Sequence, residues 1–264
     1  MVELEHAREL LCGMGLGTAA DLLDAQIERS LHEEQTCIRF LDELLTLEQN
    51  ERNRRSEETR IKMSRLPHRK GLDEFDFSFQ PSIDKRQVDE LATLAFAARA
   101  ENVVLLGPPG VGKTHLAVGI AMTALKSGLT VYYTSLARLI EDLKLSSQQN
   151  RLEKRWRVYL RPTILIIDEV GYMQLNRQEA ELLFRLISER YEHGSIILTS
   201  NKFFSDWGEL LSDTVIATAL LDRLLHHSHV INIRGQTYRL KDRLKSGECT
   251  LKQALVKDKR FPEL

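Results

Sequence analysis

Five short runs of apolar, often β-branched residues recur after residue 100. Between them lie segments with apolar residues at three- and four-residue spacing, which is typical of helices. Strands that alternate with helices are typical of a parallel sheet covered on both faces. The pattern predicts a three-layer α/β domain at residues 82–264, with five parallel strands at 101–106 (ENVVLL), 129–135 (LTVYYTS), 163–169 (TILIIDE), 195–201 (SIILTSN) and 229–233 (HVINI).

The chain before this domain has only the helical pattern. Segments 18–31 (TAADLLDAQIERSL) and 37–49 (CIRFLDELLTLEQ) carry it, and GMGLG at 13–17 separates them from a first short helix. The last of these helices could continue to residue 64, although its apolar face disappears after residue 49. We therefore predict a small all-helical N-terminal domain at 1–66. A linker at 67–81 follows, with Pro67, Gly71 and Pro81 as breaks and Phe75, Phe77 and Phe79 as its attachment to the α/β domain.

The first predicted strand leads directly into GPPGVGKT at 107–114, and a helical segment follows it. This is the order and spacing of a phosphate-binding loop. Glycines let backbone N–H groups approach the phosphates, and the positive end of the next helix faces the same anion. The lysine can reach the β- and γ-phosphates, and the threonine hydroxyl is a ligand for Mg²⁺. The predicted ATP-binding residues are Gly107, Pro108, Pro109, Gly110, Val111, Gly112, Lys113, Thr114 and His115.

Two further strands end in polar residues suited to hydrolysis. Asp168 and Glu169 close an entirely apolar run, where ligands bind in parallel sheets. We expect Asp168 to hold Mg²⁺ and Glu169 to deprotonate the attacking water, with Lys113 on the phosphates. Asn201 ends the next run and is predicted to contact the γ-phosphate or the water, with a helix cap as its alternative. The Asn201-Lys202 pair does not indicate GTP, because Phe204 stands where guanine would need a carboxylate.

Charge is unevenly distributed, although the formal net charge is only −1. Residues 1–49 hold eleven Asp and Glu against three Arg, whereas residues 50–70 hold eight Lys and Arg against three Glu. The basic stretch is either a solvated helix surface or a surface for a polyanion. Its cations are Arg52, Arg54, Arg55, Arg60, Lys62, Arg65, Arg69 and Lys70, and a second set on the α/β domain comprises Lys144, Arg151, Lys154, Arg155 and Arg157.

Other candidate chemistry is weak. Cys12, Cys37 and Cys249 have no metal-binding spacing and are expected to be reduced thiols. The histidines of HHSH at 226–229 do not share a helix face, and no acidic or thiol partner is near them in the sequence, so we expect surface residues. A basic and apolar leader is absent from the N-terminus, and no apolar run is long enough for a membrane span. We expect a cytoplasmic protein without a membrane partner.

Several motifs together resemble the IstB-like transposition helper ATPases of bacterial insertion sequences, which are AAA+ proteins related to the DnaC helicase loaders. They are LLGPPGVGKTHLA, LIIDEVGY, ILTSN, LLDRL and GQTYRL, with RLPHRKGLDEFDF upstream. The resemblance covers nearly the whole chain. It implies an AAA+ ATPase fold, ATP and Mg²⁺ as cofactors, a homo-oligomer assembled on duplex DNA, remodelling of that DNA, and activation of a partner transposase. It also makes duplex DNA the expected partner of the basic stretch.

The resemblance assigns roles to two arginines. It makes Arg223 an arginine finger that a neighbouring subunit supplies to the ATP site, with a surface pair with Asp222 as the alternative. Arg190 is a second candidate for the finger. Arg239 would lie near the nucleotide of its own subunit as a sensor. Two other functions share the ATPase core: a replicative helicase loader, and a structural clamp in which ATP only cements the oligomer.

Overall fold

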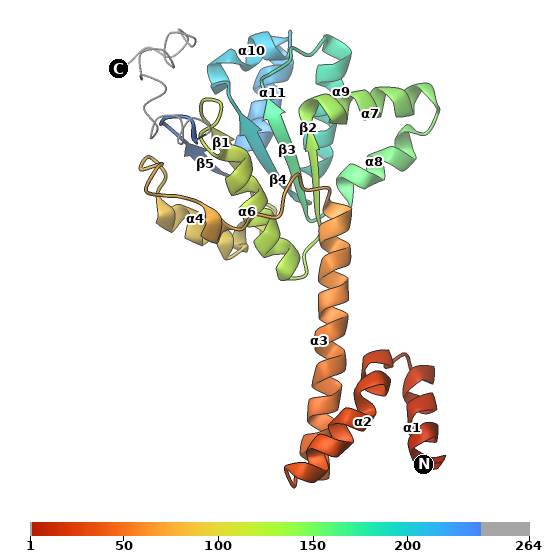
Figure 1. Ribbon diagram of the computed structural model, residues 1–264. Coiled ribbons are helices and arrows are strands. Elements are labelled where there is room, and N and C mark those ends of the chain that lie inside the picture. The colour runs from red at the N-terminus through yellow and green to blue at the C-terminus, as the bar shows by residue number, and fades with distance from the viewer. Residues whose placement is uncertain (1, 239–264) are drawn as a thin grey trace, which may run out of the picture. The chain divides into compact units, whose positions relative to one another are not determined.

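The computed structural model describes residues 2–238 of the chain. Its internal contacts divide the chain into two units, Met1–Lys62 and Met63–Leu264, which we call the N-terminal unit and the α/β unit. Figure 1 shows the helices of the first and the sheet of the second. Arg239, one of the predicted nucleotide-binding residues, lies outside the described residues.

The N-terminal unit consists of helices, as predicted. Ala19, Leu23 and Leu44 form its small buried core, against which apolar side chains of the first helix pack. The last helix continues to Ser64 without interruption, even though its apolar face is lost midway. Its second half is held by ion pairs between residues three and four positions apart. The helices are α1 (Val2–Gly13), α2 (Gly17–His32) and α3 (Cys37–Ser64).

A five-stranded parallel sheet forms the centre of the α/β unit, in the order β2-β3-β4-β1-β5. This confirms the predicted sheet. Strands β1 and β4 are buried along their whole length, which explains the apolar runs at their centres. The strands are β1 (Asn102–Leu106), β2 (Val131–Ser135), β3 (Ile164–Val170), β4 (Ser195–Ser200) and β5 (Ser228–Asn232).

Helices cover both faces of the sheet (Figure 1). Helix α6 packs on one face, and α4 lies against α6. The main apolar core lies on the other face, where side chains of α7 to α11 meet alternate residues of β1, β3 and β4. The helices are α4 (Lys85–Ala92), α5 (Ala95–Ala98), α6 (Lys113–Lys126), α7 (Leu136–Gln148), α8 (Leu152–Leu160), α9 (Arg177–Arg190), α10 (Trp207–Leu210) and α11 (Thr214–Leu225), with short 3-10 helices η1 (Leu72–Glu74) and η2 (Phe204–Asp206).

The helical segment before β1 is interrupted. The structure has α4 and α5 with Leu94 between them in the left-handed region, at φ 64°. The bend accompanies the burial of Phe96 and Ala97, which are 2% and 8% exposed. Tertiary burial has therefore outweighed helix continuity at this point.

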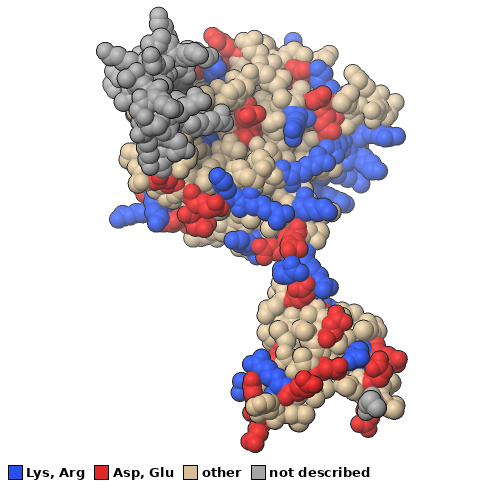
Figure 2. All heavy atoms as spheres, in the orientation of Figure 1, with Lys and Arg blue, Asp and Glu red and all other residues tan. Residues whose placement is uncertain are grey.

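Charged side chains are distributed differently over the two units. On the face drawn in Figure 2, Lys and Arg gather over the region of α7 and α8 in the α/β unit. Acidic and basic side chains are interspersed over the helices of the N-terminal unit in the same view. The second basic set of the sequence, on α7 and α8, is thus a surface feature of the folded protein.

Candidate functional site

The phosphate-binding loop joins β1 to α6 and needs its glycines for two separate reasons. Gly110 and Gly112 have φ of 83° and 101°, in the left-handed region that a side chain disfavours. A Cβ on Gly110 would lie 2.0 Å from Thr237 Oγ1, and one on Gly112 would lie 2.7 Å from the ring of Phe75. Other segments of the chain therefore pack directly against the loop and leave no space for larger residues.

Lys113 is the first residue of α6, and its side chain is mostly buried. Its Nζ donates hydrogen bonds to the carbonyl oxygens of Gly107 and Pro108, at 2.7 and 2.8 Å. The loop thus folds back over the ammonium group that it contains. An anion in the loop would meet this charge at the N-terminus of α6, where the helix dipole also favours it.

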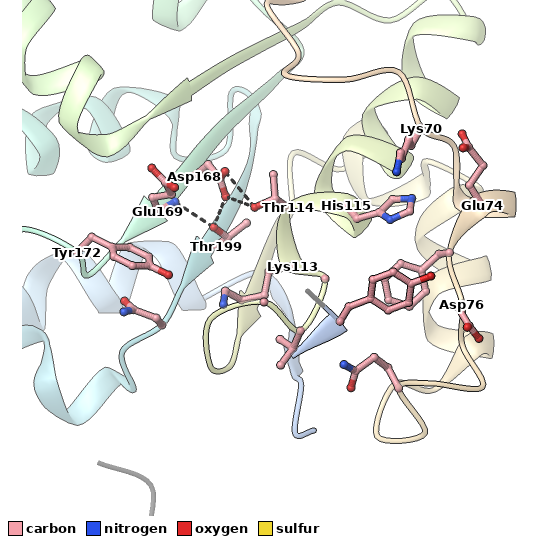
Figure 3. Close-up of a pocket in the computed structure, with 17 residues that line it drawn as sticks. Lys70, Glu74, Asp76, Lys113, Thr114, His115, Asp168, Glu169, Tyr172 and Thr199 are labelled. Carbon is pink, nitrogen blue, oxygen red and sulfur yellow. Dashed lines mark hydrogen bonds between the residues drawn. The ribbon is translucent and has the colours of Figure 1, made fainter. Parts of the chain in front are cut away.

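Asp168 lies near the end of β3 at the centre of a polar cluster (Figure 3). Its carboxylate accepts hydrogen bonds from the Thr114 hydroxyl at 3.0 and 3.1 Å, from the Tyr133 hydroxyl at 2.6 Å, and from the Thr199 hydroxyl. It is only 2% exposed. Burial, followed by the hydrogen bond to this carboxylate, raises the pKa of Tyr133 well above its usual range, so Tyr133 remains a neutral donor.

These residues fit Mg²⁺, because hard cations prefer carboxylate and hydroxyl oxygens. Thr114 and Asp168, which the sequence assigned to the metal, already place their oxygens within hydrogen-bond distance of each other. Tyr133 and Thr199 were missed by the sequence analysis. The signal available for Thr199 was its place beside Asn201 at the end of an apolar strand, but Tyr133 gave none.

Glu169 differs from its neighbour in being exposed. The register of β3 with β4 is irregular between Ile167 and Val170, and Glu169 has φ 62°. Its backbone N–H donates to Thr199 Oγ1 at 3.1 Å instead of pairing with the strand. This irregularity turns the Glu169 carboxylate out of the sheet so that it lines the same pocket as Lys113.

Asn201 follows β4 and lines the pocket as well. Its Oδ1 is buried and has no hydrogen-bond partner among the described residues. A Cβ on Gly171 would lie 2.4 Å from this oxygen, so the glycine after β3 allows the close approach. An unsatisfied buried amide oxygen beside two carboxylates is suited to accepting a hydrogen bond from a water molecule.

The segment predicted as a linker forms one wall of the pocket (Figure 3). His115 Nε2 lies 3.1 Å from the Gly71 carbonyl oxygen, and its ring meets that of Phe75 edge-on at 5.3 Å. His115 therefore faces this segment and not the centre of the phosphate loop. The additional lining residues, which sequence reasoning did not assign to the site, are Lys70, Glu74, Phe75, Asp76, Gln80, Tyr172 and Tyr238.

Arg223 is not among the described residues that line the pocket. It lies on α11, where its guanidinium stacks over the Phe184 ring at 4.5 Å and its Nη1 contacts the Ser188 hydroxyl of α9. It is partly exposed and makes no ion pair with Asp222 among the described residues. The fold thus separates this arginine from the ATP site of its own chain.

Arg190, the second finger candidate, has a different place. Its side chain is 2% exposed, and its guanidinium donates to five backbone carbonyl oxygens. Burial lowers its pKa to about 10, which still leaves it charged at neutral pH. An arginine enclosed in this way cannot reach a neighbouring subunit, so the structure removes Arg190 from consideration. The acceptors belong to Tyr159, Leu160, Pro162, Thr163 and Ser195.

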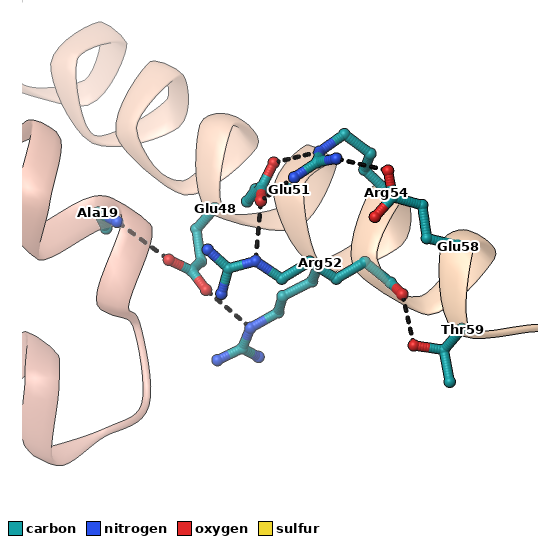
Figure 4. A network of polar contacts seen from close by, with 8 residues as sticks. Ala19, Glu48, Glu51, Arg52, Arg54, Glu58 and Thr59 are labelled. Atoms are coloured by element: carbon teal, nitrogen blue, oxygen red, sulfur yellow. Dashed lines mark hydrogen bonds and ion pairs between the residues drawn. The ribbon is translucent and has the colours of Figure 1, made fainter. Parts of the chain in front are cut away.

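The basic stretch 50–70 does not form one uniform surface. Arg54 bonds to Glu51 and Glu58 at 2.7–2.8 Å, and Arg55 bonds to Glu51 at 2.8 Å (Figure 4). The hydrogen bonds from Arg54 and Arg55 lower the pKa of Glu51 to about 2. Much of the positive charge on α3 is therefore balanced within the helix, which the residue count alone did not reveal.

Other cations of the stretch have structural contacts. Arg52 bonds to buried Glu48 at 2.9 Å and to the Gly15 carbonyl oxygen at 2.6 Å, and Glu48 in turn accepts from the Ala19 N–H (Figure 4). Arg65 lies over the Tyr132 ring at 5.6 Å. Lys70 lines the ATP pocket. Contact of Arg60, Lys62 and Arg69 with DNA stays a prediction, as it does for the other five cations.

A family model described as IstB-like ATP binding protein matches residues 10–246. The chain is 49% identical over 236 residues to an insertion sequence IS21 protein of Pseudomonas aeruginosa that is named as ATP-binding, with 89% of each chain covered. It is 46% identical over 239 residues to the corresponding IS5376 protein of Geobacillus stearothermophilus, which covers 90% of this chain and 95% of the relative.

Two solved structures share the fold. DnaI superposes with a TM-score of 0.53 at 21% identity, over 67% of this chain and 92% of that one. AMPPCP-bound DnaA from Aquifex aeolicus also gives 0.53, at 19% identity, over 73% of this chain and 60% of that one. These similarities show the AAA+ fold and carry no further conclusion. Within residues 2–238, every helix is too short or too polar to cross a membrane.

Proposed function

The chain belongs to the family of IstB-like ATP-binding proteins of insertion sequences, and on this premise we propose that it hydrolyses ATP to assist transposition. In this proposal it assembles on duplex target DNA, deforms that DNA, and recruits and activates a partner transposase. The observation that carries the ATPase part is the convergence of Thr114, Asp168, Glu169 and Asn201 on the pocket beside Lys113.

Each of these residues would have a separate role in ATP hydrolysis. Lys113 exchanges the two loop carbonyl oxygens for phosphate oxygens when ATP enters the loop. Thr114 and Asp168 hold Mg²⁺, which supplies positive charge to the phosphates. Glu169 accepts the proton of the attacking water, and Asn201 positions that water through its unsatisfied Oδ1. Tyr133 and Thr199 keep the Asp168 carboxylate in place through their hydrogen bonds.

Hydrolysis in this proposal depends on assembly. The described part of the chain places two lysines, Lys70 and Lys113, but no arginine in the pocket. Within residues 2–238, the charge that develops on the γ-phosphoryl group would therefore have no arginine of the same chain to balance it. Arg223 lies on a different helix, partly exposed, and a neighbouring subunit could present it. ATP hydrolysis would then occur only between correctly assembled subunits. Such coupling suits a protein whose oligomer is recognised by a transposase.

The proposed DNA partner is tested by comparing duplex and single-stranded DNA of equal length. Binding would be measured by fluorescence anisotropy with a non-hydrolysable ATP analogue, for the wild type and for Lys113→Ala, and the complexes would be viewed by electron microscopy. We expect ordered assemblies on the duplex that require nucleotide and are missing for Lys113→Ala. Preference for single strands would favour a helicase loader instead. Wild-type assembly without measurable phosphate release would favour a structural clamp.

A further inference from the structure

Two helices of the α/β unit end beside each other and bring together three metal-binding side chains. Glu192 follows the end of α9, and His226 and His227 follow the end of α11. One ligand atom from each lies within 4.8 Å of the others. The two imidazole rings are 4.1 Å apart between centroids, and His227 Nε2 lies 3.8 Å from Glu192 Oε1. All three side chains are exposed, so an ion can reach them from solvent.

This arrangement differs from what the sequence suggested. Consecutive histidines would point apart on a continuous helix, and Glu192 lies 34 positions before His226 in the chain. However, α11 ends at Leu225, and the chain turns out of the helix at the histidines. Glu192 has φ 60°, a left-handed conformation that changes the chain direction directly after α9. The two turns together supply the acidic partner that was missing.

Two features beyond proximity favour a cation here. The carboxyl ends of α9 and α11 both lie at this point, and the partial negative charge of helix C-termini attracts cations. In addition, the Tyr191 hydroxyl lies 2.7 Å from His226 Nδ1. In the tautomer in which Nδ1 donates to this oxygen, the lone pair of Nε2 is left for a metal ion, and such an outer hydrogen bond is usual for metal-binding histidines.

The charges around the group are compatible with this. Asp222 on α11 and Glu192 itself add negative charge near Tyr191. Arg223 is the cation on the same helix, and its guanidinium contacts Ser188 and the Phe184 ring. His193 follows Glu192 and is exposed.

We propose that Glu192, His226 and His227 bind a divalent transition-metal ion of the Zn²⁺ type, with an open fourth position. Two imidazoles and one carboxylate suit Zn²⁺, Ni²⁺ or Cu²⁺ and not Mg²⁺ or Ca²⁺. Ligand atoms of a tetrahedral Zn²⁺ site are separated by about 3.4 Å for bonds of about 2.1 Å, so exposed side chains need to move only slightly. The site is separate from the ATP pocket, because the His227 carbonyl oxygen pairs with Asn102 at the opposite end of β1 from the phosphate loop.

A bound ion would connect α9 to α11. Helix α9 carries Ser188 and helix α11 carries Arg223, and these two side chains are in contact. The ion would therefore also restrict movement of the proposed arginine finger. Metal binding therefore has a direct structural readout, namely a higher midpoint of thermal unfolding. This readout needs neither ATP turnover nor DNA, and its outcome is independent of the proposed function.

The test uses the full chain without an affinity tag, stripped of metal and kept in millimolar Mg²⁺ to saturate the ATP site. Zn²⁺ and Ni²⁺ would be titrated by calorimetry into the wild type, Glu192→Gln, His226→Ala and His227→Ala. The matched control is His32→Ala, which removes an exposed histidine of α2. We expect one equivalent to bind the wild type and the control, and at least about a tenfold loss of affinity in each of the three variants.

Thermal unfolding with and without Zn²⁺ separates loss of the site from loss of the fold. Unfolding midpoints in a chelator should be alike for all five proteins, and Zn²⁺ should raise them only for the wild type and His32→Ala. Equal Zn²⁺ affinity in all proteins would place the ion elsewhere, for example on the exposed thiols of Cys12 and Cys37, and would overturn the proposal. So would the absence of binding to the wild type at micromolar metal.

Discussion

Lys113 and Glu169 both line the ATP pocket, but they would act at different stages. Lys113 is buried under the loop and neutralises charge whenever phosphates are bound. Glu169 is exposed at the irregular end of β3 and would act only on the attacking water. Their substitutions should therefore separate binding from turnover.

We predict that Lys113→Ala weakens ATP binding by about tenfold to a hundredfold, because it removes a charge-assisted hydrogen bond. Glu169→Gln should bind ATP normally and lose about 10²–10⁴ in turnover, the usual contribution of a general base. Nucleotide affinity measured beside steady-state phosphate release distinguishes the two. Hydrolysis by Glu169→Gln at the wild-type rate would show that another group activates the water.

Arg190 illustrates a residue whose role is in folding. It joins carbonyl oxygens at the end of α8 and just after it to one in β4, and a Cβ on Gly194 would lie only 2.6 Å from its Nη2. We predict that Arg190→Ala lowers the free energy of unfolding by about 3–5 kcal/mol, because it leaves several buried carbonyl groups without donors.

The measurement is urea unfolding followed by circular dichroism, with Arg161→Ala as the control. Arg161 is exposed at the end of α8 and has no ion pair among the described residues, so its loss should change stability little. If both substitutions have the same small effect, the carbonyl contacts do not stabilise the fold.

Helices α3 and α8 offer alternative basic surfaces for the proposed DNA partner. On α3, Arg54 and Arg55 are already paired with Glu51 and Glu58. On and just before α8, the exposed cations Arg151, Lys154 and Arg157 have no ion pairs among the described residues, and Figure 2 shows basic side chains gathered over this region. On α3, a DNA phosphate would have to compete with glutamates for the arginine side chains. The three cations around α8 would require no such competition.

We predict that the salt dependence of duplex binding will show which of the two basic surfaces contributes more to binding. Arg54→Glu, Arg55→Glu and Lys62→Glu together should weaken duplex binding on all sequences alike and flatten the salt slope by about one unit per lost contact. The matched variant replaces Arg151, Lys154 and Arg157 with Glu. Salt titrations with a non-hydrolysable ATP analogue would compare both with the wild type.

If the α3 variant keeps the wild-type slope while the α8 variant loses it, the cations of α3 form a solvated surface and the DNA lies against α8. ATP hydrolysis without DNA should survive in both variants, because neither set contains a residue proposed for catalysis. A change in that activity would indicate a folding defect.

At the level of the proposed assembly, Arg223 would act on an ATP site only from a second copy of the chain. It lies on α11, supported by Phe184 and Ser188 of α9, and it is not among the described lining residues of its own ATP pocket. An arginine supplied by a neighbour makes each active site a property of the interface between two subunits. Two defective proteins can then complement each other.

We predict that Arg223→Ala binds ATP normally as a dilute monomer but loses about 10³–10⁵ in turnover in the assembly. Mixing it with Lys113→Ala should restore part of the activity, because one protein supplies an intact loop and the other an intact finger. Phosphate release would be measured across mixing ratios. Co-assembly without any recovery would exclude a finger in trans.

The sequence alone determined the features that depend on local spacing. The apolar strands, the loop at 107–114 and the polar residues that end β3 and β4 can be read from adjacent residues, because strand burial and phosphate binding each impose a pattern on a short segment. The parallel order then places all strand ends at one edge of the sheet. That is why the carboxylates and the loop of the ATP site could be predicted without coordinates.

Only the tertiary structure decided which distant residues meet. Tyr133 reaches Asp168 because β2 and β3 pair in register, although the two residues are 35 positions apart. Glu192 approaches His226 because two helices end at the same place, and Arg190 is buried because the end of α8 and the residues after it surround the guanidinium. Packing between separate helices and strands determines such contacts. The spacing of apolar and polar residues within either segment therefore does not reveal them.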